Sequence, residues 1–411
     1  MLYRLVKLSY LVFIFYMVWY QSAFSPINRA PLILGSSMML LLILYKMSRR
    51  GKISFSLADP IIIWIVFAIF ALFSGYIVAA NRDVLLNSIT TYAQIIILMV
   101  FIVDFSRYEG NANFFLKSYA FLSIVYSLYM LFFGYRFLGR VTLSASSNPN
   151  GDGLTLIYGI FCILTLSEGS KRKMTFFVSQ ALIGLLLYSI VLTGSRKSFL
   201  AAVALVFLWF ILVFPRRFRA SELKWKLVYS AWILSIVLLG AALFLPIFLH
   251  SVLFFRLTEE LGAQSDQVRI SMYQMSAEFF ASSPLVGIGF NQFRVLSPWR
   301  TYSHSTYAEI ISSTGIIGTI LYFIPYCWII YKLIYVYLLR RKSEVGTQAL
   351  MYLVLMIVML LLGAGVIHFY SITDNIMFAL MISFCAQSLT DIKKERAQVS
   401  RKREEPRLGL Y

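Results

Sequence analysis

Charged residues, cysteine and histidine are scarce in this chain of 411 residues. Only 13% of the residues are charged, and there are three cysteines and three histidines. A soluble globule of this length needs more polar surface, so the composition excludes a water-soluble domain. With 60% hydrophobic residues and a mean hydropathy of +0.77, the chain is suited to lipid as its solvent.

Several motifs of soluble enzyme chemistry are also missing. The sequence has no Asp-x-Asp pair, no cluster of Cys and His, and no glycine-rich nucleotide loop. It therefore indicates neither a divalent metal site nor ATP binding, and we expect no cofactor. Cys162, Cys327 and Cys385 fall in apolar stretches and are predicted to be small buried residues.

Long apolar runs dominate the chain. Most have the length of a helix that crosses a bilayer core of roughly 30 Å at about 1.5 Å per residue. The predicted fold class is all-α, a polytopic integral membrane protein of about 12 transmembrane helices with one long outer loop. The predicted spans cover residues 8–26, 31–47, 59–80, 85–103, 113–134, 153–167, 175–193, 199–214, 227–249, 306–335, 348–367 and 375–390.

Four regions follow from these spans. Residues 1–249 hold spans one to nine, and 250–305 form an extracytoplasmic loop with an amphipathic helix. Residues 306–390 hold spans ten to twelve, and 391–411 form a basic cytoplasmic tail.

Lys and Arg gather in alternate connections, as in segments that are retained on the cytoplasmic side. This bias predicts that both termini are cytoplasmic, and it accounts for most of the net charge of +19 without nucleic acid as a partner. The residues that carry it are Arg4, Lys7, Lys46, Arg49, Arg50, Lys52, Lys171–Lys173, Arg216, Arg217, Arg219, Lys224, Lys226, Arg340–Lys342 and the tail from Lys393 to Arg407.

The basic residues that remain for the outer side are almost all Arg. A planar guanidinium suits phosphate, so an Arg-rich outer face suggests an anionic ligand, although some of these side chains would simply hold loops or reach lipid head groups. They are Arg29, Arg82, Arg136, Arg140, Arg196, Lys197, Arg256, Arg269, Arg294 and Arg300.

The long outer loop holds one predicted helix, Gln267–Phe280. Apolar residues recur at helical spacing from Val268 to Phe279, and Arg269 lies on another face. The helix is suited to the membrane surface or to a simple lid over the bundle. Further along, Gly287 and Gly289 allow a tight turn or a close approach to a ligand.

The end of this loop carries the candidate proton acceptor. All three histidines map to outer ends of spans, and His304 has polar neighbours on both sides. Taken alone, this placement favours a structural role. In combination with the other motifs, it makes His304 a candidate base for a hydroxyl. Glu309 is a carboxylate within the tenth span. It needs a partner, and a salt bridge to an Arg is the alternative to a functional role.

Two turn-rich segments complete the outer set. Ser147–Gly153 precedes the sixth span, and Gly194–Ser198 forms a sharp connection between spans seven and eight. Arg196 is therefore presented at the membrane boundary.

In order and spacing, these motifs resemble the O-antigen ligase and O-antigen polymerase superfamily of bacterial envelope glycan enzymes. The resemblance covers mostly residues 145–320, and the family commonly has His-Asn where this chain has His304-Ser305. It rests on Asn148-Pro149-Asn150, Gly194-Ser195-Arg196, the run from Arg269 through Pro284-Leu285-Val286-Gly287-Ile288-Gly289, His304 with Glu309, and Gly315-Ile316-Ile317-Gly318.

The resemblance implies a metal-independent glycosyl transfer from an undecaprenyl-diphosphate-linked glycan on the outer face of a bacterial cytoplasmic membrane. Arg196 and Arg269 would bind the donor diphosphate, His304 would position or deprotonate the acceptor hydroxyl, and Glu309 would orient His304 or an Arg. The implied catalytic residues are His304 and Glu309, and the implied substrate-binding residues are Arg196, Arg269, Asn150 and Tyr307.

Polymerase and ligase differ in their acceptor, which is a second lipid-linked repeat unit for the first and a lipid A core for the second. We favour polymerisation into a surface polysaccharide such as O-antigen, capsule or exopolysaccharide, with ligation as the alternative. The expected partners are the lipid-linked donor and acceptor, membrane lipids, and as further candidates a flippase and a chain-length regulator. A transporter or flippase, and a noncatalytic assembly partner, stay open as other classes. Polar residues at the outer ends of spans favour surface chemistry over transport.

Overall fold

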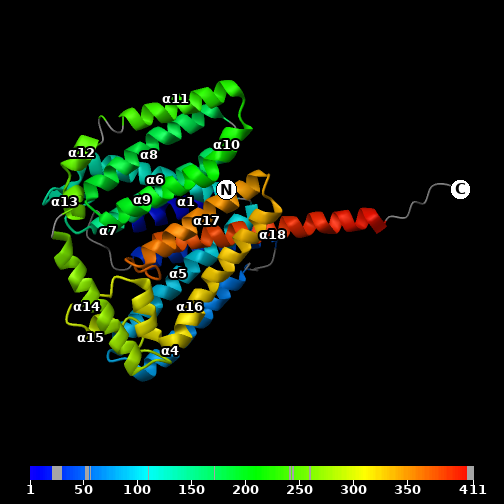
Figure 1. Ribbon diagram of the computed structural model, residues 1–411. Coiled ribbons are helices and arrows are strands. Elements are labelled where there is room, and N and C mark those ends of the chain that lie inside the picture. The colour runs from blue at the N-terminus through cyan, green and yellow to red at the C-terminus, as the bar shows by residue number, and fades with distance from the viewer. Residues whose placement is uncertain are drawn as a thin grey trace.

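The computed structural model describes residues 1–20, 30–50, 55, 57–109, 111–170, 172–239, 242, 245–258 and 261–404, almost all of them helical (Figure 1). A short hairpin, β1 (Tyr135–Phe137) and β2 (Arg140–Thr142), pairs antiparallel with Arg136 opposite Val141. The helices are α1 (Leu2–Phe15), η1 (Tyr16–Tyr20), α3 (Ala30–Arg50), α4 (Asp59–Val78), α5 (Arg82–Glu109), α6 (Ala112–Phe133), α7 (Pro149–Glu168), α8 (Lys173–Thr193), α9 (Arg196–Leu208), η2 (Trp209–Val213), α10 (Phe214–Ala220), α11 (Leu223–Leu239), α12 (Leu245–Leu249), α13 (Val252–Thr258), α14 (Leu261–Ser282), α15 (Phe293–Leu296), α16 (Thr306–Leu339), α17 (Glu344–Gly363) and α18 (Ile372–Glu404).

Membrane-spanning helices make up most of this inventory. Among the described residues, 11 helices are long and apolar enough to cross a bilayer. They are α1 with η1, α3 to α8, α9 continued by η2 and α10, and α16 to α18. α11 is apolar over its 17 described residues. The predicted all-α, polytopic membrane fold is confirmed.

Several predicted boundaries were wrong. The first helix begins at Leu2 rather than residue 8, the sixth at Pro149 rather than 153, and the ninth at Leu223 rather than 227. Residues 21–26 of the first predicted span lie outside the described residues. The differences share one cause, because hydropathy marks the part of a helix that suits lipid, whereas capping and backbone hydrogen bonds decide where the helix ends.

The cysteines follow the prediction in two of three cases. Cys162 and Cys385 are buried, but Cys327, within α16, is exposed. In a membrane helix an apolar side chain is equally suited to lipid, so apolar context alone did not identify the buried face.

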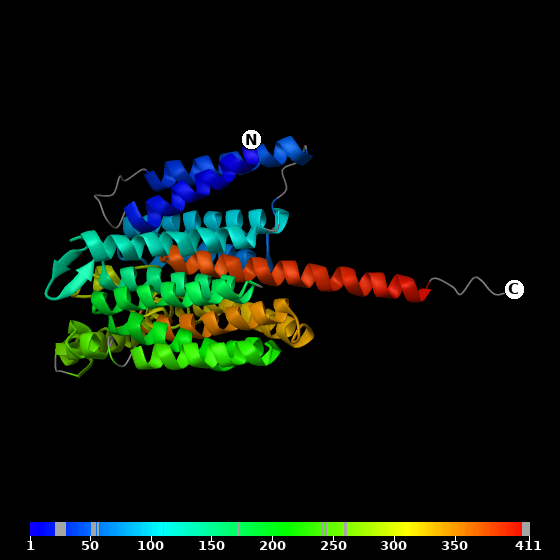
Figure 2. The same cartoon turned by 90° about the horizontal axis from the view of Figure 1, so that it is seen from above.

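The centre of the bundle is formed by α7 and α18, which are the most buried of the spanning helices. α7 packs between α6 and α8, while α18 packs on α5 and α16. α16 also contacts α4, α17 and α14. α1 and α3 pair with each other at one side of the bundle (Figure 2).

The two ends of the bundle differ. The hairpin and the short helices α12 to α15 lie at one end, and α18 extends far beyond the bundle at the opposite end (Figure 2). Lys173, Arg216 and Arg341, three of the residues expected inside, line a common pocket that is formed where α8, α10 and the α16–α17 connection meet. The ends predicted to be outer and inner are thus separate in space.

α16 is broken near its start, and this break receives the preceding loop. Gly315 has φ +61° and ψ −167° inside the helix. The amide of Ile288 donates to Ser312 O at 3.0 Å, and the amide of Ile316 donates to Pro284 O at 2.9 Å. A Cβ on Gly315 would lie 2.4 Å from the backbone of Leu285, so the close approach requires glycine.

Candidate active site

The turn between α8 and α9 positions Arg196. Gly194 ends α8 in the left-handed conformation at φ +63°, and Ser195 caps α9 by accepting a hydrogen bond from the Ser198 amide. Ser195 Oγ also donates to Asn150 Oδ1 at 2.7 Å, which ties the turn to the start of α7. Arg196 is consequently the first residue of α9, as the turn motif predicted.

Two further arginines hold the same turn. Arg140 Nε donates to Thr193 O and Arg256 Nη1 donates to Gly194 O, both at 2.7 Å. Burial and the neighbouring charges of Arg196 and Arg269 lower the pKa of Arg256. Burial, followed by the charge of Arg256, lowers the pKa of Arg140 to about 10. Several cations are therefore crowded into a small volume.

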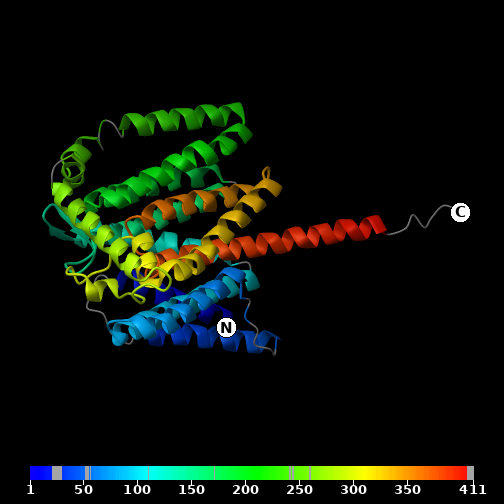
Figure 3. The ribbon, with the colours of Figure 1, turned by 60° about the horizontal axis from the view of Figure 1, so that its bottom comes forward.

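Arg196 and Arg269 meet at one carboxylate. Asp266 Oδ1 lies 2.9 Å from Arg196 Nη2 and 3.3 Å from Arg269 Nη1. The Arg side chains are 19% and 24% exposed, whereas Asp266 is 47% exposed. Asp266 and Arg269 lie on α14, which runs from α13 to the start of α16 (Figure 3). The predicted helix at Gln267–Phe280 is thus confirmed as part of α14.

Lys197 completes the group of cations. Its ammonium donates to Gly365 O. The carbonyl of the preceding residue, Ala364, accepts a hydrogen bond from Tyr273 OH at 2.9 Å. We call Arg140, Arg196, Lys197, Arg256 and Arg269 the cation cluster. It joins β2, α9, α13 and α14 to the connection between α17 and α18, and Asp266 contacts two of its members.

His304 lies beside this cluster. Burial, followed by the positive charges of Lys197 and Arg269, lowers the pKa of His304 to about 4. The ring packs against Tyr302, with centroids 4.9 Å apart. Its backbone has φ +59°, an uncommon conformation for a residue with a side chain. The imidazole is therefore neutral near pH 7 and can accept a proton.

Glu309 fixes the backbone on the N-terminal side of His304. It is fully buried, and its Oε2 accepts a hydrogen bond from the Ser303 amide at 2.7 Å. On the other side, Ser305 caps α16 and its hydroxyl donates to Gly363 O at 3.4 Å. Both neighbours of His304 are anchored, which supports its strained conformation.

The remaining two candidates have different surroundings. Asn150 reaches the cluster indirectly, through its hydrogen bond from Ser195. Tyr307 OH donates to Leu360 O at 2.6 Å and its ring stacks on Phe323 at 5.6 Å. The described contacts of Tyr307 thus lie on α16 and α17, whereas Arg196, Arg269 and His304 come together around α14.

Sequence reasoning missed the connection between α17 and α18. It offers carbonyls to Lys197 and Tyr273, and its Val366 O accepts from the Thr306 amide at 3.1 Å. Backbone acceptors leave no mark in a sequence. The buried Asp374, which accepts from Tyr158 OH, was also missed, although an acid within a span is a recognisable signal. Among the described residues, no group of three or more His, Cys, Asp or Glu is placed to hold a metal ion.

Comparison with known proteins addresses the identity of this region. Residues 181–323 match a family model. The family that this model describes is O-antigen ligase, so this segment of the chain is similar to that family. The matched segment includes Arg196, Arg269, His304 and Glu309, and the match confirms the resemblance to the ligase and polymerase superfamily. It indicates ligase- or polymerase-type activity in an integral membrane protein.

The other comparisons are weaker. No curated protein matches the chain. A chain from a solved structure described as "Structural coordination of polymerization and crosslinking by a peptidoglycan synthase complex" matches with 12% identity and a TM-score of 0.44. That match covers 84% of this chain and 99% of the other.

Proposed function

We propose that the protein polymerises undecaprenyl-diphosphate-linked oligosaccharide repeat units into a surface polysaccharide, without a metal ion, on the outer face of a bacterial cytoplasmic membrane. The observation that carries the proposal is that Lys197 and Arg269 of the cation cluster lie beside a neutral His304, within the matched residues. In this proposal both termini are cytoplasmic, and a flippase and a chain-length regulator are the partner proteins.

The donor diphosphate replaces Asp266 between Arg196 and Arg269. The Asp266 carboxylate is half-exposed, and an ion pair of that kind contributes only about 0–1 kcal/mol. A diphosphate carries more charge and more acceptor oxygens, and each guanidinium binds it through two parallel donors. The same contacts stabilise the charge that develops on the leaving diphosphate.

The neutral imidazole of His304 accepts the proton of the acceptor hydroxyl. The acceptor oxygen then forms the new glycosidic bond to the anomeric carbon of the donor. The bond between that carbon and the diphosphate oxygen breaks, and undecaprenyl diphosphate leaves with the electron pair. The low pKa keeps His304 unprotonated, because burial, followed by the charges of Lys197 and Arg269, opposes a positive charge on its ring.

Ligation to a lipid A core is the second candidate, because the matched family is described as O-antigen ligase. The donor chemistry is the same in both cases, since each transfer releases a lipid diphosphate. Only the acceptor distinguishes them, so the test has to read the product.

The test is the glycan profile of a deletion strain that is complemented with wild type, His304→Ala or Arg269→Ala. The matched controls are His250→Ala and Arg136→Ala, since both residues are exposed and lie outside the cluster. Loss of one group that stabilises the transition state lowers turnover by roughly 10²–10³-fold. We expect both site variants to lose long chains and both controls to keep them.

The outcome also separates the candidates. Single repeat units attached to their carrier or core, without long chains, indicate a polymerase. Full-length chains stranded on the lipid carrier indicate a ligase and overturn the proposed polymerisation. Unchanged glycans in both site variants would reject the catalytic assignment altogether.

A further inference from the structure

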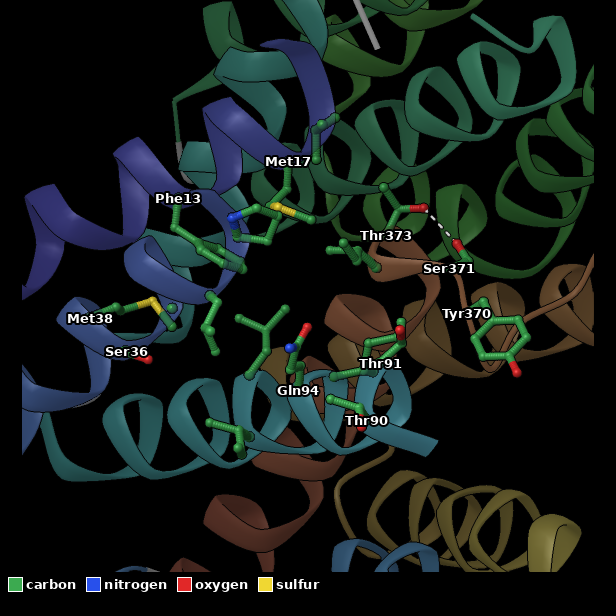
Figure 4. A pocket seen from close by; sticks show the side chains of 18 of the residues that line it. Phe13, Met17, Ser36, Met38, Thr90, Thr91, Gln94, Tyr370, Ser371 and Thr373 are labelled. Carbon is green, nitrogen blue, oxygen red and sulfur yellow. Dashed lines mark hydrogen bonds between the residues drawn. The ribbon is translucent and has the colours of Figure 1, made fainter. Parts of the chain in front are cut away.

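A large cavity lies on the side of α7 that faces α1, α3 and α5, whereas most of the cation cluster lies on α9, α13 and α14. Its volume is about 1080 Å³. α1, α3 and α5 form one side, and the starts of α7 and α18 form the other. In Figure 4, Thr91 and Gln94 face Phe13 and Met17 across this space, and Ser371 and Thr373 close one end.

One wall is an uncharged polar stripe on a membrane helix. Asn87, Thr90, Thr91 and Gln94 lie at helical spacing along α5, and all four are exposed into the cavity. The two threonine hydroxyls donate to carbonyls of their own helix and keep free acceptor lone pairs. Polar groups at membrane depth are costly unless a partner satisfies them, so this stripe indicates a hydrogen-bonding occupant.

The lining contains little charge. Of the described residues that form it, none is Lys, Arg or His. Its carboxylate, Asp152, is already satisfied, with Tyr126 OH at 2.6 Å, Ser147 Oγ at 3.0 Å and the Leu143 amide at 3.1 Å. The described part of the lining therefore offers no cation to a phosphate, which distinguishes it from the cation cluster.

The other part of the lining is apolar. Along α5, Ile95, Ile97 and Leu98 follow the polar stripe toward the inner end. Met17 on η1 and Met38 on α3 face the same space (Figure 4). Methionine adapts to irregular apolar ligands such as flexible hydrocarbon chains. The cavity thus changes from hydrogen-bonding to apolar along its length, and its size exceeds that of most drug-sized pockets.

We propose that this cavity binds a lipid with an uncharged, sugar-type head group. The sugar hydroxyls bond to the α5 stripe and to Ser371 and Thr373, and the hydrocarbon chain lies against Met17, Met38 and Leu98. The site is independent of the proposed transfer reaction, because its lining includes no residue of the cation cluster.

Native mass spectrometry of the purified full chain tests this site. Three probes with the same acyl chains are compared: monoglucosyl-diacylglycerol, phosphatidylglycerol and diacylglycerol. The Asn87→Leu/Gln94→Leu double variant removes the central hydrogen bonds, and Gln180→Leu on α8 is the matched control. Gly35→Leu is an independent variant that fills the cavity, since a Cβ at Gly35 meets only Phe13, at 3.6 Å.

Two hydrogen bonds of about 1 kcal/mol each correspond to a loss of roughly tenfold or more in affinity. We expect the wild type and Gln180→Leu to bind the glucosyl lipid at least tenfold more tightly than the other probes. The double variant and Gly35→Leu should lose this preference. Equal binding of all three lipids, or a preference that survives both Gly35→Leu and the double variant, would overturn the proposal.

Discussion

At the residue scale, the two roles proposed for the surroundings of His304 make opposite demands on charge: one is to bind an anion, and the other is to keep a base available. A site for diphosphate needs positive charge, and positive charge lowers the pKa of a nearby imidazole. Burial together with Lys197 and Arg269 lowers the pKa of His304 to about 4. The histidine is a weaker base as a result, but it stays unprotonated near neutral pH.

This arrangement predicts an unusual pH profile. Transfer needs neutral His304, so kcat/KM should stay constant from neutral pH downward and fall only as the pH drops through about 4. Lys197→Met removes a charge that opposes protonation, so the acid limb should move upward, toward 6.5. Lys173→Met, at the opposite end of the bundle, is the control. A wild-type limb already near 6.5 would contradict the assigned environment.

We propose that Glu309 is a positioning residue, and its hydrogen bond from the Ser303 amide suggests a discriminating pair of variants. Glu309→Ala leaves the buried Ser303 amide without an acceptor, at a cost of about 1–3 kcal/mol. We expect kcat to fall while KM stays unchanged. Glu309→Gln keeps an oxygen acceptor and should recover most of kcat. The kinetics of both variants are measured, and their thermal unfolding is followed in parallel. If Glu309→Gln is as inactive as Glu309→Ala, the carboxylate charge itself is needed.

At the scale of elements, the break in α16 locks the long loop onto the bundle. Gly287 and Gly289 have φ of +71° and +100°, and the Gly289 amide donates to Ser313 O at 3.0 Å. The sequence predicted a tight turn or a close approach at these glycines, but not that the approach would be to α16. Gly315, the other half of the contact, is distant along the chain, and a contact between distant glycines leaves no local pattern.

A substitution at this break should destabilise the loop and the site together. Gly315→Ala forces a side chain into φ +61° and against Leu285, at a cost of about 1–3 kcal/mol or more. Gly184→Ala on α8 meets nothing within 4 Å, and helix propensity predicts a neutral or slightly stabilising effect. Thermal unfolding of both variants in the same detergent compares them. Equal melting temperatures would show that the break is unimportant.

Other elements followed from local patterns to different degrees. The sharp turn at Gly194-Ser195 and the helix bearing Arg269 were predictable, because both depend on short-range spacing. The shared carboxylate at Asp266 was not, since only the fold brings α9 beside α14. The carbonyls of Ala364 and Gly365 belong to the backbone, which every residue has, and therefore could not be predicted as part of the site.

At the scale of the molecule, the proposed reaction requires that the end of the bundle with the cation cluster faces outward. The hairpin and α14 lie at the end that carries the cation cluster, and the inner basic pocket lies at the other end. The distribution of Lys and Arg predicts that the cluster is extracytoplasmic. Every proposed step uses a lipid-linked donor on that side.

Single cysteines test the orientation. In a variant without Cys162, Cys327 and Cys385, Ser146→Cys near the hairpin should react with a membrane-impermeant maleimide in intact cells. Lys224→Cys, at the start of α11, should react only after the membrane is permeabilised. The reverse labelling pattern would place the cation cluster in the cytoplasm and contradict the account.

The most direct measurement of the central claim is the reaction of the purified protein in liposomes with a polyprenyl-diphosphate-linked repeat unit as the only substrate. Polymer and released lipid diphosphate are quantified for wild type, Arg269→Gln and His304→Ala, with Arg136→Gln as the control. The account predicts polymer and lipid diphosphate from wild type and control, and rates roughly 10²–10³-fold lower from the two site variants. Turnover at the wild-type rate in both site variants would contradict it.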